Sequence, residues 1–110
     1  MKLYIGCDLG GTNMRAAVVD VDSGSVLHQM SVPTLARDGH DSVMQRMAIL
    51  CLDVIQSAGM NKEEINGIGI GVPGVLDLAK GETLFLPNLE GTWPNVPLRN
   101  TITKRTGLPT

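Results

Sequence analysis

Apolar and polar positions alternate with a period of two in the first third of the chain, which is typical of β-strands. Residues 3–7 show this alternation, and small or β-branched residues fill 14–21. The turn-forming sequence at 22–24 separates that second run from a third run over 25–32. The pattern predicts a meander of three antiparallel strands at the start of the fold.

The period changes to that of an amphipathic helix from residue 42 onward. Apolar side chains recur three and four positions apart as far as residue 58, with polar side chains opposite them. Asp38 or Asp41 is placed to cap the first turn, and Gly59 stands where a left-handed residue ends a helix. The sequence therefore predicts a helix over 42–58 whose methionines and Cys51 fill a core.

Glycine occupies alternate positions in and around the next predicted strand, residues 68–72, so one face of that strand is branched and the other is bare. A loop rich in glycine, proline and asparagine follows over 73–97, with a short strand at 83–86. Residues 98–106 are typical of a helix, with the preceding proline at its first position and Gly107 at its end. This order of elements predicts an α/β fold with a mixed sheet and helices packed on it.

The composition is that of an ordinary globular chain and narrows the possible partners. Of the 110 residues, 43% are apolar and 18% are charged, and the net charge is −2. No basic excess is present for a nucleic acid backbone or an anionic membrane, so we expect neither partner. No signal-peptide hydrophobic region precedes Asp8 and no apolar run is long enough to span a membrane, which predicts a cytoplasmic protein. The two cysteines and two histidines lack metal-ligand spacing, and both cysteines are expected in the core.

The segment with the most chemical information is Asp8-Leu9-Gly10-Gly11-Thr12-Asn13, which lies between two predicted strands. Adjacent glycines permit positive φ and let backbone N–H groups approach an anion, while the Thr12 hydroxyl and the Asn13 amide add donors. Asp8 repels phosphate by itself but can hold a Mg²⁺ ion beside it, directly or through water. The pattern predicts a phosphate-binding turn without a Walker lysine.

The glycine patterns also admit other interpretations. The turn fits a plain hairpin in which the glycines satisfy turn geometry and the aspartate caps it. A P-loop is absent, because no glycine-rich segment ends in Lys-Ser or Lys-Thr. Residues 69–74 match the dinucleotide fingerprint G-x-G-x-x-G in letters only, since two of the glycines lie inside a strand and no long helix follows. Those strand glycines instead indicate close approach by another backbone or a ligand.

Residues 87–93 bring an amide, a hydroxyl and the only tryptophan of the chain into one loop. Asn88 and Thr92 carry groups that suit sugar hydroxyls, and the Trp93 indole can cover a sugar face. Loops commonly collect such residues without binding anything, so the composition of this loop leaves both interpretations open.

Four motifs occur in one order and spacing: D-L-G-G-T-N at 8–13, G-I-G-V-P-G at 69–74, P-N-L-E-G-T-W at 87–93 and N-V-P-L-R at 95–99. Together they resemble the N-terminal region of the ROK-family glucokinases and of related hexose and N-acylmannosamine kinases. The resemblance covers nearly the whole chain. Four collinear motifs are far more specific than any one of them.

The resemblance implies an actin-like ATPase fold, in which each of two lobes is built on a ribonuclease-H-like sheet and ATP binds between them. Residues 1–110 would form the N-terminal lobe of a sugar kinase. The implied reaction is the phosphorylation of a hexose, glucose at its 6-hydroxyl, by Mg²⁺ and ATP, as in glycolysis. The full-length protein is expected to be a homo-oligomer, a dimer.

The resemblance also assigns roles to residues at the matching positions. Asp8 would be the acid on the metal side of ATP. Groups that bind the nucleotide phosphates would come from Gly10, Gly11, Thr12, Asn13 and, just after the turn, Arg15. Gly74 and Asn88 would lie at the sugar. Arg15 could equally well be a solvent-exposed charged residue of the hairpin with no role in binding.

Other parts of the implied active site have no counterpart in these residues. In the family, an Asn-Asp pair whose aspartate is the general base follows on the next strand, and the Glu and His sugar ligands and a structural zinc motif come later. All of them would lie beyond Thr110. The resemblance therefore implies a lobe truncated before its catalytic base, and we expect residues 1–110 alone to be inactive.

Two other functions use the same lobe. A sugar-responsive ROK transcriptional regulator would use it for binding only, but such regulators carry a helix-turn-helix domain ahead of the phosphate turn, and here Asp8 almost directly follows the first residue. A non-sugar ATPase of the actin-like superfamily, such as an acetate kinase, would show no preference for a hexose. We favour the sugar kinase.

Overall fold

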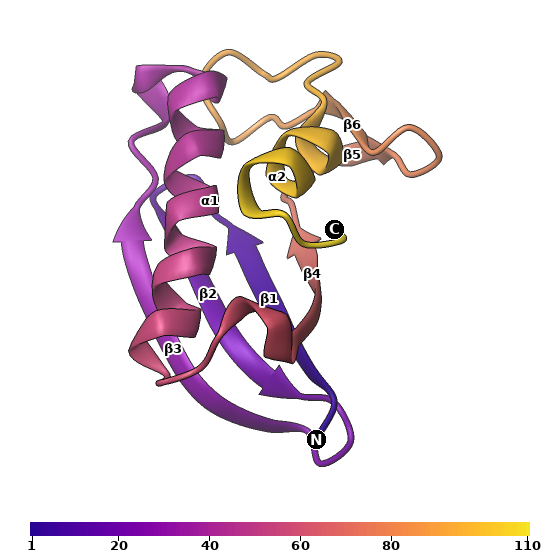
Figure 1. The fold of residues 1–110 in the computed structure, drawn as a ribbon. Coiled ribbons are helices and arrows are strands. Elements are labelled where there is room, and N and C mark those ends of the chain that lie inside the picture. Colours follow the sequence, from indigo (N-terminus) through magenta and orange to yellow (C-terminus); the bar gives the residue numbers. More distant parts are fainter.

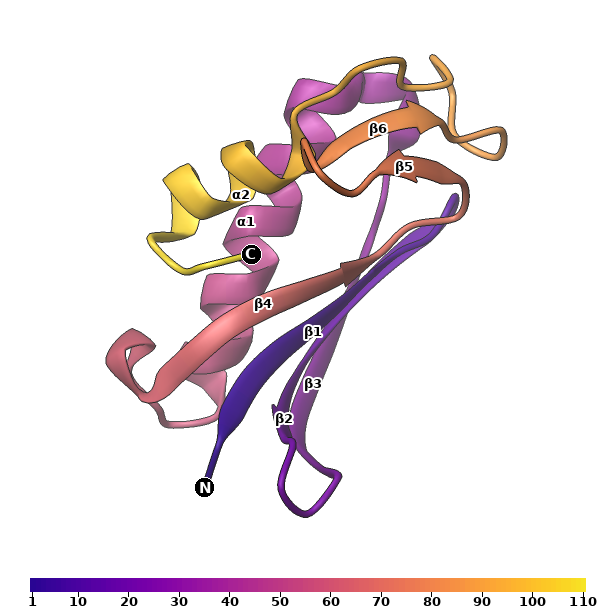
Figure 2. The ribbon, with the colours of Figure 1, turned by 90° about the vertical axis from the view of Figure 1, so that its right-hand side faces the viewer.

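The computed structural model describes residues 1–110 and places both α-helices on one face of a four-stranded sheet (Figure 1). The view turned by 90° shows that no helix covers the opposite face (Figure 2). The strands are β1 (Leu3–Leu9), β2 (Asn13–Asp20), β3 (Ser25–Pro33), β4 (Ile65–Gly71), β5 (Val75–Asp77) and β6 (Glu82–Phe85). The helices are α1 (His40–Ser57) and α2 (Leu98–Thr106), with short 3-10 turns at Ala36–Asp38 and Lys62–Glu64.

The main sheet is mixed and has the strand order β3-β2-β1-β4. β1 and β3 each run antiparallel to β2, as predicted, whereas β4 is parallel to β1 because α1 forms the crossover between β3 and β4. In this register Asp8 lies opposite Arg15 on one side and Gly71 on the other. The predicted loop over 73–97 contains more order than expected, since β5 and β6 pair as a separate two-stranded sheet.

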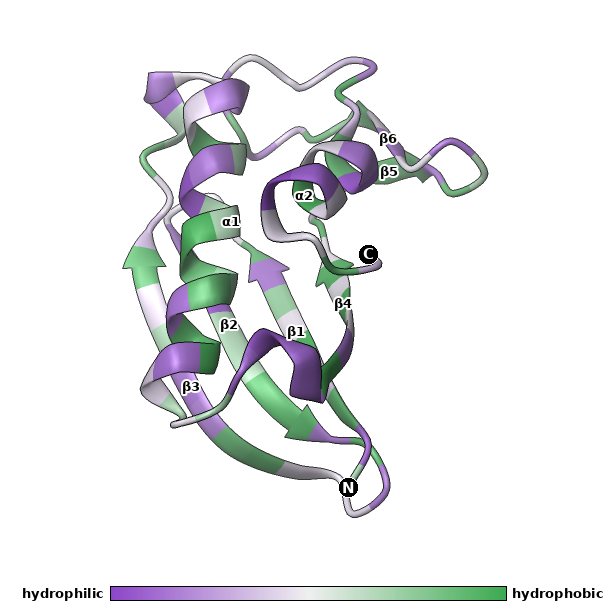
Figure 3. Cartoon of the chain, viewed as in Figure 1, coloured by the Kyte–Doolittle hydropathy of each residue, from purple (hydrophilic) through white to green (hydrophobic).

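The core lies between the two helices and the covered face of the sheet. Leu3, Ile5, Cys7 and Leu9 point into it from β1, and each is at most 4% exposed. Hydrophobic residues are concentrated in the middle of α1 and on the strands behind it (Figure 3). The buried stripe of α1 confirms the predicted helical period and consists of Val43, Met44, Met47, Ala48, Leu50, Cys51, Val54 and Ile55. Each fully buried leucine or isoleucine stabilises the fold by about 1.5–3 kcal/mol.

Both cysteines are free thiols buried in this core, as predicted. A hydrogen bond with Cys7 and burial both raise the pKa of the Cys51 thiol. Cys51 therefore stays protonated and packs as a small hydrophobic side chain.

The ends of α1 correct one prediction and confirm another. Gly39, with φ of 95°, precedes the helix and no side chain caps its first turn, so the predicted capping by Asp38 or Asp41 is wrong. Asp38 instead forms an ion pair with Arg46 at 3.0 Å. Gly59 follows the helix in the predicted left-handed conformation, with φ of 74°.

α2 begins just after Pro97, which occupies the capping position and not the predicted first helical position. Gly107 ends the helix in a left-handed conformation, as predicted, with φ of 76°. Beyond it, the Pro109 carbonyl accepts a hydrogen bond of 2.7 Å from the Ile68 N–H of β4. Neither helix is long and apolar enough to cross a membrane.

We expect Ile55→Ala on the buried face of α1 to lower the free energy of unfolding by about 2–5 kcal/mol, because the truncation leaves a cavity. Ile55 is 3% exposed, whereas Ile49 on the same helix is 50% exposed. Ile49→Ala is therefore the matched control and should change this free energy by about 0.5 kcal/mol at most. Urea denaturation followed by circular dichroism measures both variants, and equal losses would contradict the assigned helix face.

Candidate functional site

The turn between β1 and β2 is closed by a 3.0 Å hydrogen bond from the Gly10 N–H to the Asn13 carbonyl. A Cβ atom on Gly10 would lie 2.6 Å from that carbonyl oxygen. Neither Gly10 nor Gly11 adopts a positive φ, so the prediction that these glycines supply a left-handed backbone is wrong. The turn requires glycine because backbone atoms approach too closely for a side chain.

The same kind of close approach brings the predicted sugar loop onto the predicted phosphate turn. A Cβ atom on Gly11 would lie 2.9 Å from the Asn88 carbonyl oxygen. A Cβ atom on Gly74 would collide with the Phe85 carbonyl and would lie 2.6 Å from Leu86 Cδ2. Gly74 therefore packs against the end of β6, and Asn88 lies three residues after that end along the chain.

The backbone N–H groups of Gly11 and Thr12 donate to no acceptor within the chain. Both residues are exposed and line a cavity of about 480 Å³. Asn88 lines the same cavity, so the structure brings three of the predicted site residues together. Sequence reasoning did not identify the rest of its lining, which consists of Leu35, Ala36, Arg37, Asp38 and Glu90.

Asp8 and Arg15 lie on the uncovered face of the sheet and line a second cavity, of about 380 Å³, beside the turn. They face each other across β1 and β2 but form no ion pair. The Asp8 carboxylate lies over Gly71, with Oδ1 3.7 Å from the position of a Cβ atom there. The bare glycine face of β4, which the alternating pattern predicted, therefore leaves this carboxylate open to solvent and ligands.

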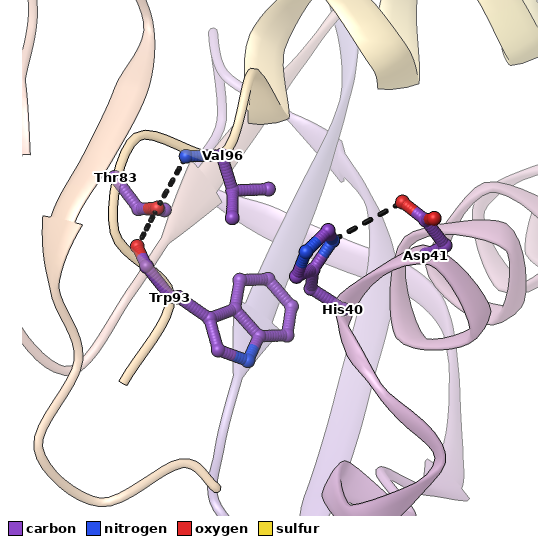
Figure 4. A network of polar contacts seen from close by, with 5 residues as sticks. All are labelled: His40, Asp41, Thr83, Trp93 and Val96. Atoms are coloured by element: carbon purple, nitrogen blue, oxygen red, sulfur yellow. Dashed lines mark hydrogen bonds and ion pairs between the residues drawn. The ribbon is translucent and has the colours of Figure 1, made fainter. Parts of the chain in front are cut away.

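Of the two interpretations left open for the loop over 87–93, the burial of Trp93 argues against the one in which its indole covers a sugar. Trp93 is 0% exposed, and its ring lies 6.0 Å from the ring of His40 at an interplanar angle of 68° (Figure 4). The loop folds inward because Leu86, Leu89 and Val96 are also buried. Trp93 therefore anchors the loop that carries Asn88, and the polar residues of this loop lie on its exposed surface.

Thr34, the residue after β3, is a contact of the turn that sequence reasoning missed. It is fully buried, its hydroxyl donates to the Gly10 carbonyl at 2.7 Å and its N–H donates to the Thr12 carbonyl at 2.8 Å. Arg46 of α1 donates in turn to the Thr34 carbonyl at 2.6 Å. The only sequence signal was the predicted hairpin itself, whose register places the end of β3 beside the turn.

A protein-family model for the ROK family matches residues 4–110, which is nearly the whole chain. The chain belongs to the ROK family. The predicted resemblance is thus confirmed. The predicted α/β fold of the actin-like type is confirmed as well, because the chain superposes on a solved ROK glucokinase structure with a TM-score of 0.81.

That ROK structure is a glucokinase from Streptomyces griseus in complex with glucose and AMPPNP, 31% identical, and the match covers 97% of this chain and 31% of that one. The chain is also 39% identical over 103 residues to a glucokinase of Thermotoga maritima, covering 94% of this chain and 30% of that protein. A putative xylose repressor of Caldicellulosiruptor sp. is 32% identical over 107 residues, with coverages of 97% and 26%. The chain spans less than a third of the length of each of these ROK relatives.

Asp8, at the end of β1, is the carboxylate of the predicted site that could take part in holding a metal ion next to the turn. No three of the chain's His, Cys, Asp and Glu side chains gather closely enough to enclose a metal. Asp8, exposed and without an ion-pair partner, fits an ion that takes its remaining ligands from phosphate oxygens and water, as Mg²⁺ does in phosphoryl-transfer sites.

We expect Gly11→Ala to push the Asn88 loop off the turn and to lower the free energy of unfolding by about 1–3 kcal/mol, because the added methyl group overpacks the contact. Gly6→Ala is the control, since a Cβ atom there would meet nothing within 4 Å. It should be neutral or stabilise by about 0.5–1 kcal/mol, because glycine weakens a strand interior. Urea denaturation of both variants, with the amide chemical shift of Asn88 as a local probe, checks this. A neutral Gly11→Ala would show that the two segments do not touch.

Proposed function

We propose that this chain is the phosphate-binding part of an ATP-dependent hexose kinase that transfers the γ-phosphoryl group to the 6-hydroxyl of glucose. The observation that carries the proposal is the cavity in which the free N–H groups of Gly11 and Thr12 stand beside Asn88. Free N–H donors that could bind phosphate and an amide that could bind a sugar, in one cavity, suit a phosphoryl transfer between a nucleotide and a sugar. The glucokinase relatives support the same reaction.

The nucleotide would be held mainly by the backbone of the turn. The N–H groups of Gly11 and Thr12, which donate to no acceptor within the chain, the Thr12 hydroxyl and the Asn13 amide would donate to phosphate oxygens. Donors fixed before the reaction stabilise charge as it develops on the transferred group. Arg15 would add a positive charge on the other side of the turn.

Asp8 would hold Mg²⁺ at the end of β1, next to the phosphates. When bound, the ion neutralises charge on the phosphates as the phosphoryl group leaves. Asp8 is suited to this role because its carboxylate forms no ion pair and lies over a glycine, so no other protein group competes for it.

The sugar would be placed by Asn88, whose amide can donate to and accept from hydroxyl groups. Gly74 has no side chain, so it would contact the sugar through its backbone.

Of the carboxylates in the cavity, Asp38 is held by Arg46 and Glu90 lies on an exposed turn. We therefore place the general base that accepts the proton of the sugar hydroxyl in the rest of the whole protein.

A sugar-responsive repressor is the second candidate, and the similarity to a putative xylose repressor favours it. In that case the same cavity would bind a sugar without phosphoryl transfer. The two functions differ in one measurable outcome, because only the kinase forms ADP in a sugar-dependent manner. A coupled assay of ADP release from ATP and glucose, on the whole protein, tests the proposal, and sugar binding without turnover would favour the repressor.

We expect Asp8→Asn in the whole protein to lower turnover by about 100-fold or more, since loss of the metal-side charge removes several kcal/mol of transition-state stabilisation. Its free energy of unfolding should change by about 0.5 kcal/mol at most, because the carboxylate is exposed and unpaired. Steady-state kinetics with glucose and ATP, beside urea denaturation, measure both quantities. Near wild-type turnover would show that Asp8 is not on the metal side of the nucleotide.

A further inference from the structure

One buried residue holds the carbonyl side of the turn. Thr34 is 0% exposed, and its two donors reach the Gly10 carbonyl through the hydroxyl, at 2.7 Å, and the Thr12 carbonyl through the backbone N–H, at 2.8 Å. Both contacts lie within ordinary hydrogen-bond distance. The two carbonyls that flank Gly11 are therefore both directed toward Thr34.

The direction of these carbonyls decides where the amide hydrogens point. All peptide bonds of the chain are trans, and in a trans peptide the C=O of one residue and the N–H of the next point in opposite directions. Holding the Gly10 carbonyl toward Thr34 turns the Gly11 N–H away from Thr34. That N–H donates to no other group in the chain.

Thr34 is in turn fixed by α1. Arg46 donates from Nη1 to the Thr34 carbonyl at 2.6 Å and from Nη2 to Asp38 Oδ2 at 3.0 Å. Hydrogen bonds from a guanidinium are stronger than neutral ones, and the two acceptors use the planar fork of the arginine. A continuous set of hydrogen bonds thus runs from the first turns of α1 through Thr34 to the turn.

We propose that Thr34 and Arg46 are positioning residues that hold the turn in its phosphate-binding conformation before a nucleotide arrives. The inference rests on the proposed function, because it assigns the turn to phosphate. Adjacent glycines have the largest conformational freedom of any residues, and an unbraced Gly10-Gly11 pair would lose that freedom on binding. The hydrogen bonds of Thr34 remove this loss in advance.

Thr106 is the control for a buried threonine that stabilises the fold but does not position the turn. Thr106 is also buried, and its hydroxyl donates to a backbone carbonyl, that of Ile102, at 2.7 Å. It lies at the end of α2, and it lines neither of the two cavities beside the turn. The Thr106 hydroxyl also accepts a hydrogen bond from the Leu108 N–H at 3.2 Å, so Thr106→Val should cost at least as much stability as Thr34→Val without affecting nucleotide binding.

The experiment compares Thr34→Val, Thr34→Ser and Thr106→Val in the whole protein. Relaxation of ¹⁵N nuclei should show the order parameters of Gly11 and Thr12 falling from about 0.85 to below about 0.6 in Thr34→Val. Thr34→Ser keeps the hydroxyl and should retain the wild-type values, as should Thr106→Val. In steady-state kinetics the KM for ATP should rise about tenfold in Thr34→Val, the cost of one lost hydrogen bond, with the KM for glucose unchanged.

The outcomes separate this inference from the proposed function. Unchanged order parameters in Thr34→Val would overturn the inference whatever the activity, as would an unchanged KM for ATP in an active kinase. A wild-type protein without sugar-dependent turnover would overturn the proposed function, while the order parameters would still decide whether Thr34 holds the turn.

If Thr34→Val fails to fold, Arg46→Lys replaces it, because lysine can reach the Thr34 carbonyl or Asp38 but lacks the fork that bridges both. Arg46→Lys should lower the order parameters of Gly11 and Thr12 and raise the KM for ATP, each to a smaller extent than expected for Thr34→Val. Wild-type values of these quantities in Arg46→Lys would overturn the inference.

Discussion

Backbone segments approach one another at the end of β1 more closely than any side chain would allow, and the arrangement of the site depends on this. Gly10 makes room for the Asn13 carbonyl, and Gly11 makes room for the Asn88 carbonyl. Without these approaches the turn would not close and the loop that follows β6 would stand away from it. Glycine is needed here for space, because neither residue has a positive φ.

The surroundings of these glycines are rigid for reasons of packing. On one side, the loop that carries Asn88 is anchored by Trp93, which is buried together with three aliphatic side chains of the same loop. Thr92, Trp93 and Asn95 all have φ between 51° and 56°, a conformation that costs non-glycine residues about 1–3 kcal/mol each and persists only where packing enforces it. On the other side, Thr34 and Arg46 connect the turn to α1. A flexible pair of glycines is thereby held between two well-packed elements.

Much of this fold could be predicted from local patterns. The period-two runs predicted the meander, the three-and-four spacing predicted α1, and Gly59 and Gly107 end their helices as expected. The site was harder to predict, because its geometry comes from register and packing. Thr34 is, in sequence, only a polar residue after a strand, and the pairing of β2 with β3 alone brings it to Gly10. The position of Trp93 stayed open in the sequence analysis, because Leu86, Leu89 and Val96, which are buried with it, are spaced without a regular period.

The most direct measurement is a titration of the ¹⁵N-labelled whole protein with AMPPNP and Mg²⁺, followed by amide chemical shifts. If the turn binds phosphate, the free N–H groups of Gly11 and Thr12 should gain acceptors, and their shifts should change most and saturate together. The amide of Gly107, at the end of α2, should not respond. Saturable binding that leaves Gly11 and Thr12 unmoved while other amides shift would contradict the assignment of this turn to the nucleotide.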